Sequence, residues 1–217
     1  MSPRILLSRV LLTAVLSSGC FGATIYDESI LGDLSNSGLS PTFLNFSLGS
    51  NVVRGTTGLG TIVDRDYFTF VVPQGAALTS LVELANTTVG SAVSFIGIQQ
   101  GNAVTVPDAQ TAAGLLGWAH YGAATTDTDL LPAMSTPNLG STGFNGSLGA
   151  GTYSVWIQDG NVGTFSYGFD FRLNAVPEPG TLWMVLGALA AIAFRSRIYL
   201  AASRAVPSDL VSWFRNS

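Results

Sequence analysis

The chain has 217 residues, of which 47% are hydrophobic and only 10% are charged, and its formal net charge is −4. A negative charge and a pI near 4.7 have the wrong sign for a protein that binds nucleic acid. The high apolar content excludes an extended disordered chain, and a single cysteine excludes an intrachain disulfide framework.

The N-terminus has the layout of a secretory signal. Arg4 and Arg9 precede a short apolar run at 10–16 and small residues at 17–20. A basic start, a brief apolar run and a small-residue exit are typical of a signal peptide, and the run is too short for a membrane anchor. We therefore expect a cleaved signal peptide over residues 1–23, with a buried N-terminal helix as the alternative.

Cys20 allows a second interpretation of this segment. Ser17-Ser18-Gly19-Cys20 resembles a lipoprotein box, in which the cysteine becomes the lipidated first residue, although Ser17 stands where a leucine-like residue is usual. If cleavage falls after Cys20 instead, the mature protein has no thiol, which suits an oxidising exported compartment.

Residues 24–175 are dominated by strand patterns with apolar side chains at every second position. The predicted strands are 66–73, 78–84, 91–98, 151–158 and 163–173, with weaker candidates at 43–48 and 51–54. Between the last two strands, Asp159-Gly160-Asn161 is a turn signal of the hairpin type. The pattern predicts an all-β, antiparallel β-sandwich.

The stretch from Pro107 to Pro137 is less regular. We expect one helical turn at 108–113 and an ordered, loop-like insertion. Five apolar residues would then cap an open end of the sandwich: Leu115, Leu116, Trp118, Leu130 and Leu131.

Two of the predicted strands carry a family resemblance. The stretch 64–75 (DRDYFTFVVPQG) looks like the central strand of bacterial pre-peptidase C-terminal domains, and 148–157 (LGAGTYSVWI) is similar to their penultimate strand. The resemblance covers roughly residues 43–174. It implies a jelly-roll-like sandwich that accompanies secreted enzymes, or binds for them, without catalysis.

The sequence contains few candidate catalytic groups. His120 is the one histidine, and a lone histidine in an aromatic stretch is usually structural. The sequence Gly163–Gly168 has one residue too many for a nucleophile elbow, and there is no phosphate loop or dinucleotide glycine pattern. We therefore expect no enzyme activity and no catalytic residues.

Acidic residues cluster in three places. Asp27, Glu28 and Asp33 lie near the mature N-terminus; Asp64 and Asp66 flank Arg65 at a strand start; Asp127 and Asp129 occupy a loop. Calcium takes carboxylate and carbonyl oxygens from such loops. Because the resembling sandwiches bind calcium near their N-terminal segment, Asp27, Glu28 and Asp33 are the candidate metal ligands. Two alternatives stay open: acids that only cap turns, and a carboxylate pair of a hydrolase.

The C-terminal region has three parts. Val176-Pro177-Glu178-Pro179 leads into an uncharged apolar run at 181–194, and Arg195 and Arg197 follow. The run is shorter than the roughly 20 residues of a spanning helix, although arginine snorkelling or bilayer thinning can cover the deficit. We expect a C-terminal transmembrane helix there, with a buried core helix as the alternative.

This layout resembles the PEP-CTERM sorting signal of Gram-negative bacteria, also called an ice-binding-protein C-terminal domain. The resemblance covers 176–197. It implies recognition of Val176, Pro177, Glu178, Pro179, Arg195 and Arg197 by an exosortase-type membrane protease, typically in organisms that make exopolysaccharide. Ice binding is discounted, since the threonines of this chain form no regular array.

The sequence therefore divides into a signal peptide (1–23), a β-sandwich (24–175), a sorting signal (176–197) and an atypical tail (198–217) that family members usually lack. The leading hypothesis is a non-enzymatic exported protein. It would be anchored transiently in the inner membrane through 181–194 and then sorted to the cell surface or extracellular matrix. The alternative is a calcium- or carbohydrate-binding adhesive module that contacts exopolysaccharide.

Overall fold

A computed structural model describes residues 23–90, 94–107 and 111–176, together with residues 187, 189 and 192. The predicted signal helix, and all but those three residues of the predicted transmembrane helix, lie outside the described residues. Within the described part of the chain, no helix combines the length and the apolar character needed to cross a membrane.

The described domain contains nine strands and two short helices. In chain order they are β1 (Ala23–Asp27), α1 (Glu28–Leu31), β2 (Thr42–Phe43), β3 (Gly49–Leu59), β4 (Val63–Val72), β5 (Ala76–Glu83), β6 (Phe95–Gln100), β7 (Gly117–His120), α2 (Leu131–Ser135), β8 (Gly151–Gln158) and β9 (Phe165–Ala175).

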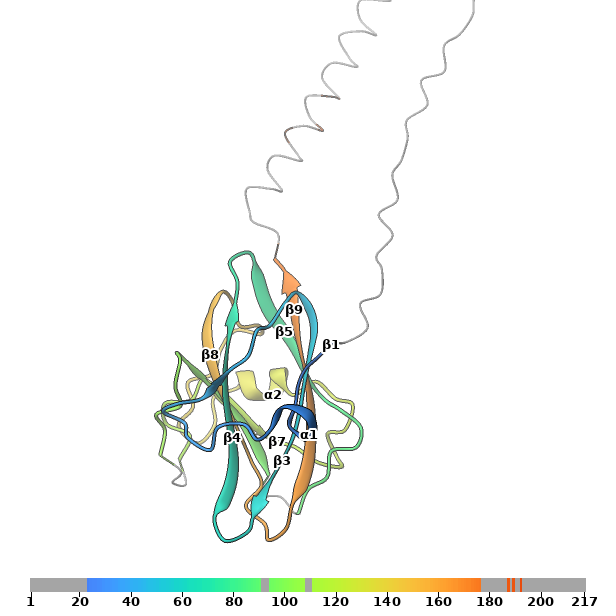
Figure 1. The fold of residues 1–217 in the computed structure, drawn as a ribbon. Coiled ribbons are helices and arrows are strands. Elements are labelled where there is room, and N and C mark those ends of the chain that lie inside the picture. The colour runs from blue at the N-terminus through green and yellow to red at the C-terminus, as the bar shows by residue number, and fades with distance from the viewer. Residues whose placement is uncertain are drawn as a thin grey trace, which may run out of the picture.

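Seven of the strands follow one another in a continuous sheet, in the order β5-β9-β3-β4-β8-β6-β7. All neighbours on this path are antiparallel, whereas β1 joins β3 and β2 joins β4 in parallel. The link between β3 and β4 is narrow, since it pairs only Gly58 with Asp64 and Leu59 with Val63. The sheet curls at this link into a half-barrel with β4 and β8 on one side and β3, β9 and β5 on the other (Figure 1). The prediction of a mostly antiparallel β domain is confirmed.

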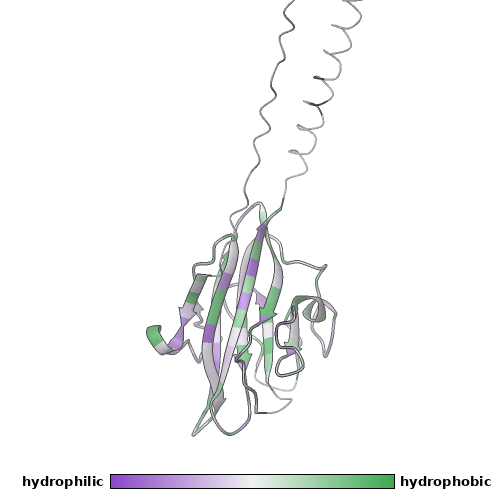
Figure 2. Cartoon of the chain, turned by 90° about the vertical axis from the view of Figure 1, so that its right-hand side faces the viewer, coloured by the Kyte–Doolittle hydropathy of each residue, from purple (hydrophilic) through white to green (hydrophobic). Residues whose placement is uncertain are grey.

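The core lies inside the curl because alternate side chains of each strand point inward. Phe68 and Phe70 of β4 meet Phe171 of β9, with ring centroids 5.5 and 5.7 Å apart, and all three rings are fully buried. Hydrophobic and polar residues accordingly alternate along the strands in Figure 2. These phenylalanines hold the two sides of the half-barrel together.

The predicted hairpin between the last two strands is wrong. β8 pairs with β4 and β6, whereas β9 pairs with β3 and β5. Residues 159–164 therefore cross from one side of the half-barrel to the other. The turn signal itself is real, because the Asp159 carboxylate accepts a hydrogen bond from the Asn161 backbone N–H at 2.8 Å.

The structure also differs from two weaker local predictions. The candidate strand 43–48 is reduced to the two residues of β2, while 51–54 lies within the longer β3. In the irregular insertion, residues 111–113 are not helical, and residues 108–110 lie outside the described part. The insertion instead contributes β7 and α2, and Leu131 of α2 is fully buried in the core.

Candidate functional site

The acidic site begins at the short helix α1, and Asp27 is the residue directly before this helix. The Asp27 carboxylate accepts hydrogen bonds from the backbone N–H and the hydroxyl of Ser29, at 3.0 and 2.5 Å. This is N-terminal capping, and the Ser29 hydrogen bonds lower the pKa of Asp27. The helix ends after one turn at Gly32, whose φ of +91° suits a residue without a side chain.

Glu28 follows the cap and is fixed between two parts of the chain. One carboxylate oxygen accepts from the Leu34 backbone N–H at 3.0 Å, and the other accepts from the Thr56 backbone N–H of β3 at 2.8 Å. Burial nevertheless raises the pKa of Glu28, against the effect of these hydrogen bonds. The Glu28 carboxylate thus adds a side-chain contact to the pairing of β1 with β3.

A glycine on β3 makes room for this arrangement. A β-carbon at Gly55 would lie 2.6 Å from the carboxylate carbon of Glu28 and would also collide with the Tyr167 hydroxyl. The residue at this position therefore has to be glycine if Glu28 is to lie against the strand.

Asp66 of β4 forms the inner part of the site. Its side chain is fully buried, and neither carboxylate oxygen makes a hydrogen bond of ordinary geometry, although the Tyr167 hydroxyl and the Glu28 carboxylate lie close enough to influence its pKa. Burial raises the pKa of Asp66 to about 9, and the negative charge of Glu28 contributes further. A buried carboxylate without a well-formed hydrogen bond is costly, so this group either holds a proton or meets a cation.

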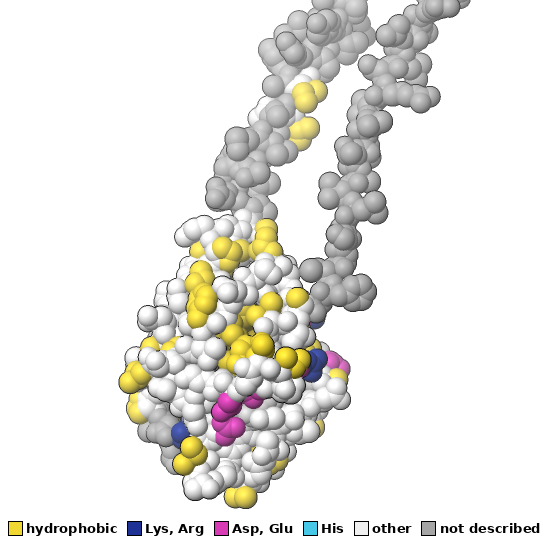
Figure 3. All heavy atoms as spheres, in the orientation of Figure 1, with side chains coloured by type: hydrophobic (Ala, Val, Ile, Leu, Met, Phe, Trp, Pro, Cys, Tyr) yellow, Lys and Arg dark blue, Asp and Glu magenta, His cyan; other side chains and the backbone are white. Residues whose placement is uncertain are grey.

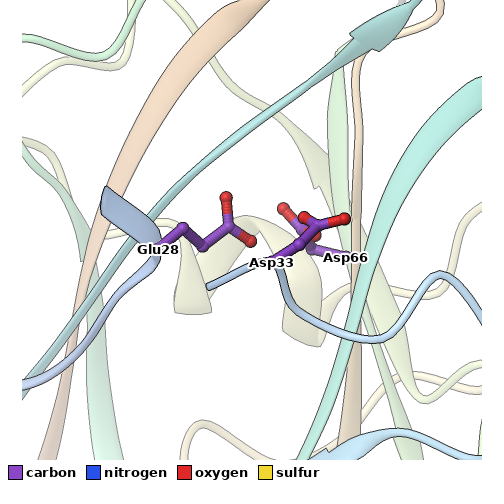
Figure 4. Close-up of side chains that lie close together, drawn as sticks. All are labelled: Glu28, Asp33 and Asp66. Carbon is purple, nitrogen blue, oxygen red and sulfur yellow. The ribbon is translucent and has the colours of Figure 1, made fainter. Parts of the chain in front are cut away.

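The carboxylates of Glu28, Asp33 and Asp66 converge at this point. One oxygen from each lies within 4.8 Å of the others, and the three come from α1, from the loop after it and from β4 (Figure 4). Asp64 lies two residues before Asp66 on the same strand. Burial, with Asp33 and Glu28 nearby, raises the pKa of Asp64 to about 6.

The site opens into a surface pocket of about 670 Å³. Glu28, Asp33 and Asp64 line it together with Arg54, Gly55 and Tyr167. Glu28 and Asp33 can therefore be reached from solvent, whereas Asp66 is buried and does not line the pocket.

The structure thus brings together two of the three predicted metal ligands. Glu28 and Asp33 converge, whereas the Asp27 carboxylate is occupied as a helix cap. The third member, Asp66, belongs to the acidic pair at the strand start. A signal for it exists in the sequence, since Asp66 shares the inward-facing parity of Phe68 and Phe70.

The other acidic loop has a structural role. Asp129 accepts hydrogen bonds from the backbone N–H groups of Leu81 and Leu131, at 2.9 and 3.0 Å. Glu83, which no sequence pattern singles out, is fully buried and accepts hydrogen bonds from the Gly122 backbone N–H and the Thr125 hydroxyl at 3.1 and 2.5 Å. These carboxylates fasten the insertion to β5 and the start of α2.

His120 lies at the exposed end of β7. Its Nδ1 is 2.7 Å from the Ser94 carbonyl oxygen, and its ring packs edge-on against Trp118 with centroids 5.1 Å apart. Among the predicted sorting residues, Val176 is described, and its backbone N–H donates to the Gly75 carbonyl at 2.7 Å. Pro177, Glu178, Pro179, Arg195 and Arg197 lie outside the described residues.

Comparison with known proteins adds one finding. Residues 175–198 match the model of the PEP-CTERM protein-sorting motif. No curated protein and no solved structure matches the chain. The motif marks an exported protein that an exosortase processes and that is sorted to the cell surface.

Proposed function

We propose that this chain is a non-enzymatic exported protein of the cell envelope or extracellular matrix whose β domain binds a divalent cation, with calcium as the best fit. The observation that carries the cation site is Asp66, a fully buried carboxylate without a hydrogen bond of ordinary geometry, close to Glu28 and Asp33. A cation there would neutralise the three carboxylates together.

Calcium suits the donors because it takes six to eight oxygen ligands in flexible geometry. Glu28, Asp33 and Asp66 supply carboxylate oxygens, and the pocket gives water access to the remaining positions. Extracellular calcium modules work at weak affinities, about 10⁻⁴ to 10⁻³ M, which a site with one exposed ligand can reach.

The cation would join distant parts of the chain. Glu28 and Asp33 belong to the N-terminal segment, whereas Asp66 belongs to β4. Because Glu28 also accepts from Thr56 of β3, the cation would link both sides of the narrow β3–β4 junction to the N-terminus. A jelly-roll-like binding module of the pre-peptidase C-terminal type, adhering to exopolysaccharide, is the role that we propose for the domain.

The same carboxylates are poorly placed for hydrolysis, which supports a binding role. A glycosidase needs two carboxyl groups that reach the scissile bond from opposite sides. Asp66 is fully buried, so a sugar cannot contact it without opening the domain. His120 faces a backbone carbonyl and the ring of Trp118, an arrangement that supports a structural role.

Thermal unfolding of the purified full chain, with calcium or with EDTA, tests the cation site. Calcium at about 100 times Kd should add about 2.7 kcal/mol, a rise in Tm of several degrees for a domain of this size. Asp66→Asn and Asp33→Asn should abolish the rise. Asp127→Asn is the matched control, because Asp127 is an exposed acid with φ +58°, which asparagine tolerates. An unchanged Tm in wild-type protein would remove the site.

Transient anchoring through 181–194 needs its own test. Epitope tags placed on each side of Pro177 should separate in cells that contain the exosortase, with the N-terminal tag leaving the inner membrane. In cells without the exosortase, both tags should stay together in the inner membrane fraction. Recovery of both tags in the soluble fraction of those cells would contradict the anchor.

A further inference from the structure

Several strand ends meet at the end of the domain where the sorting motif begins. β9 ends at Ala175, opposite Ala76 at the start of β5, and β3 starts at Gly49, opposite Leu173. On the other side of the half-barrel, the last residue of β4 pairs with Gly151 at the start of β8. We refer to this part of the molecule as the exit end. It comprises residues 47–49, 71–76, 101–103, 145–151 and 173–176.

The exit end carries no charge. None of its residues is Asp, Glu, Lys, Arg or His. The nearest charged groups along β9 are Arg172 and Asp170, which pair with each other at 2.7 Å. The acidic site lies toward the opposite end, where Asp64 pairs with Gly58 at the β3–β4 junction. The domain is therefore electrically polarised along its strands.

Apolar side chains are exposed at the same end. Leu48, Val71 and Val176 have exposed fractions of 53, 41 and 47%. Figure 3 shows this end, where β9 finishes, with hydrophobic and uncharged atoms on the face in view, and acidic side chains lower down. Apolar side chains are exposed elsewhere on the domain too, for example Ile62 and Val162 at 71 and 82%, so the lack of charge is what distinguishes the exit end.

The chain leaves almost no spacer after this end. The Val176 backbone N–H still donates to Gly75, so the folded domain extends to Val176. The apolar run begins at residue 181. Five residue steps span at most about 18 Å when fully extended. Leu189 and Ile192 of that run are helical, and their exposed fractions are 58 and 65%.

We infer that the exit end is a membrane-contacting surface, which rests on the lipid headgroups while the 181–194 segment anchors the chain. This inference depends on the anchor in the proposed function. The short connection brings the exit end to the bilayer, and its lack of charge avoids the repulsion that the acidic end would meet at anionic lipids. One charge, Glu178, lies between the domain and the apolar run.

A lipid surface is a better partner for the exit end than a protein, because the short connection to the apolar run is enough to bring this end to the bilayer. Docking of the sorting protease on the same end would need the protease to be present. The two ideas therefore differ in what a protease-free vesicle should show.

Fluorescence of single labelled positions in the full chain tests the inference. Cys20→Ser removes the native thiol, and NBD is then attached at Ser147→Cys in the exit end or at Thr61→Cys in the distant β3–β4 turn; both positions are exposed. The protein is reconstituted in vesicles of phosphatidylethanolamine and phosphatidylglycerol at 3:1, and flotation reports the anchoring. NBD emission should shift to the blue, and doxyl lipids should quench it, at position 147 but not at position 61.

Each other outcome overturns the inference. Floating protein with an aqueous emission maximum at position 147 removes the membrane contact but keeps the anchor. Protein that does not float removes the anchor as well. A blue shift that needs added exosortase assigns the surface to the protease instead.

A pair of double variants provides the matched comparison. Leu48→Glu with Val71→Glu places two negative charges on the exit end, at side chains that are already exposed. Ile62→Glu with Val162→Glu does the same at the distant end, where the exposed fractions are 71 and 82%. The first pair should abolish the blue shift at position 147, and the second should leave it unchanged. Equal behaviour of the two pairs would contradict a specific contact.

Discussion

The carboxylates of Glu28 and Asp66 lie within 4.8 Å of each other, yet their surroundings are opposite. Two backbone N–H groups donate to Glu28, whereas no backbone N–H donates to Asp66 and the described residues give it no hydrogen bond of ordinary geometry. A negative charge on Glu28 therefore raises the free-energy cost of ionising Asp66. This pairing links the stability of the domain to protons and to cations.

Without a cation, the domain should lose stability as the pH rises. The pKa of Asp66 is about 9 in the folded state and about 3.9 in an unfolded chain. Between these values the folded state holds a proton that the unfolded state releases. Asp66 alone should lower the free energy of unfolding across that window by at most about 1.4 kcal/mol per pH unit, and the raised pKa values of Asp64 and Glu28 add to the fall. Urea unfolding in EDTA from pH 5 to pH 8.5 measures the slope.

Asp66→Asn should reduce this slope, because asparagine holds no titratable proton. The control is Asp127→Asn, which leaves the buried group in place. A slope of equal size in the Asp66 variant would assign the pH dependence to another group.

Gly55→Ala should both destabilise the domain and disrupt the acidic site. A β-carbon would displace the Glu28 carboxylate and the Tyr167 hydroxyl, and overpacking of this kind costs about 1–3 kcal/mol. Urea unfolding measures the loss, and the calcium-dependent rise in Tm should shrink with it. Gly60→Ala is the matched control, since its β-carbon would meet no atom within 4 Å. Equal stability of the two variants would contradict the packing at Gly55.

Phe171→Ala tests the contact between the two sides of the half-barrel. The Phe171 ring is fully buried and meets Phe46, Phe68 and Phe70, with centroids 5.3, 5.5 and 5.7 Å away. Its removal should cost about 3–5 kcal/mol in the free energy of unfolding. Phe43→Ala, at a ring that is 55% exposed, should cost less than 1 kcal/mol. A small loss at Phe171 would mean that the sheet holds its curl without this ring.

The strands could be predicted from sequence because alternation is a local property. β8 occupies the predicted residues 151–158. The pairing partners of these strands could not be predicted. A turn signal such as Asp159-Gly160-Asn161 fixes a local bend, but not the side of the half-barrel that the chain enters next. The same limit applies to the site. Glu28 and Asp33 are close in sequence and could be grouped, whereas Asp66 joins them only through the path of the N-terminal segment over β3 and β4.

The membrane contact predicts a dependence on spacer length. A flexible insert of about ten Gly and Ser residues between Val176 and Pro177 has a root-mean-square span of roughly 17 Å, which about doubles the reach of the connection. The domain would then sample positions away from the bilayer, because a contact made by a few apolar side chains is weak once the short connection no longer enforces it. The blue shift of NBD at position 147 should diminish, while the Tm of the domain should stay the same, since the insert follows the last backbone hydrogen bond of the fold at Val176. An insert of equal length at the exposed turn Gly60–Ile62 controls for chain length and should leave the blue shift intact. If the spacer after Val176 leaves the emission unchanged, the exit end binds lipid by its own affinity and the connection is not what holds it there.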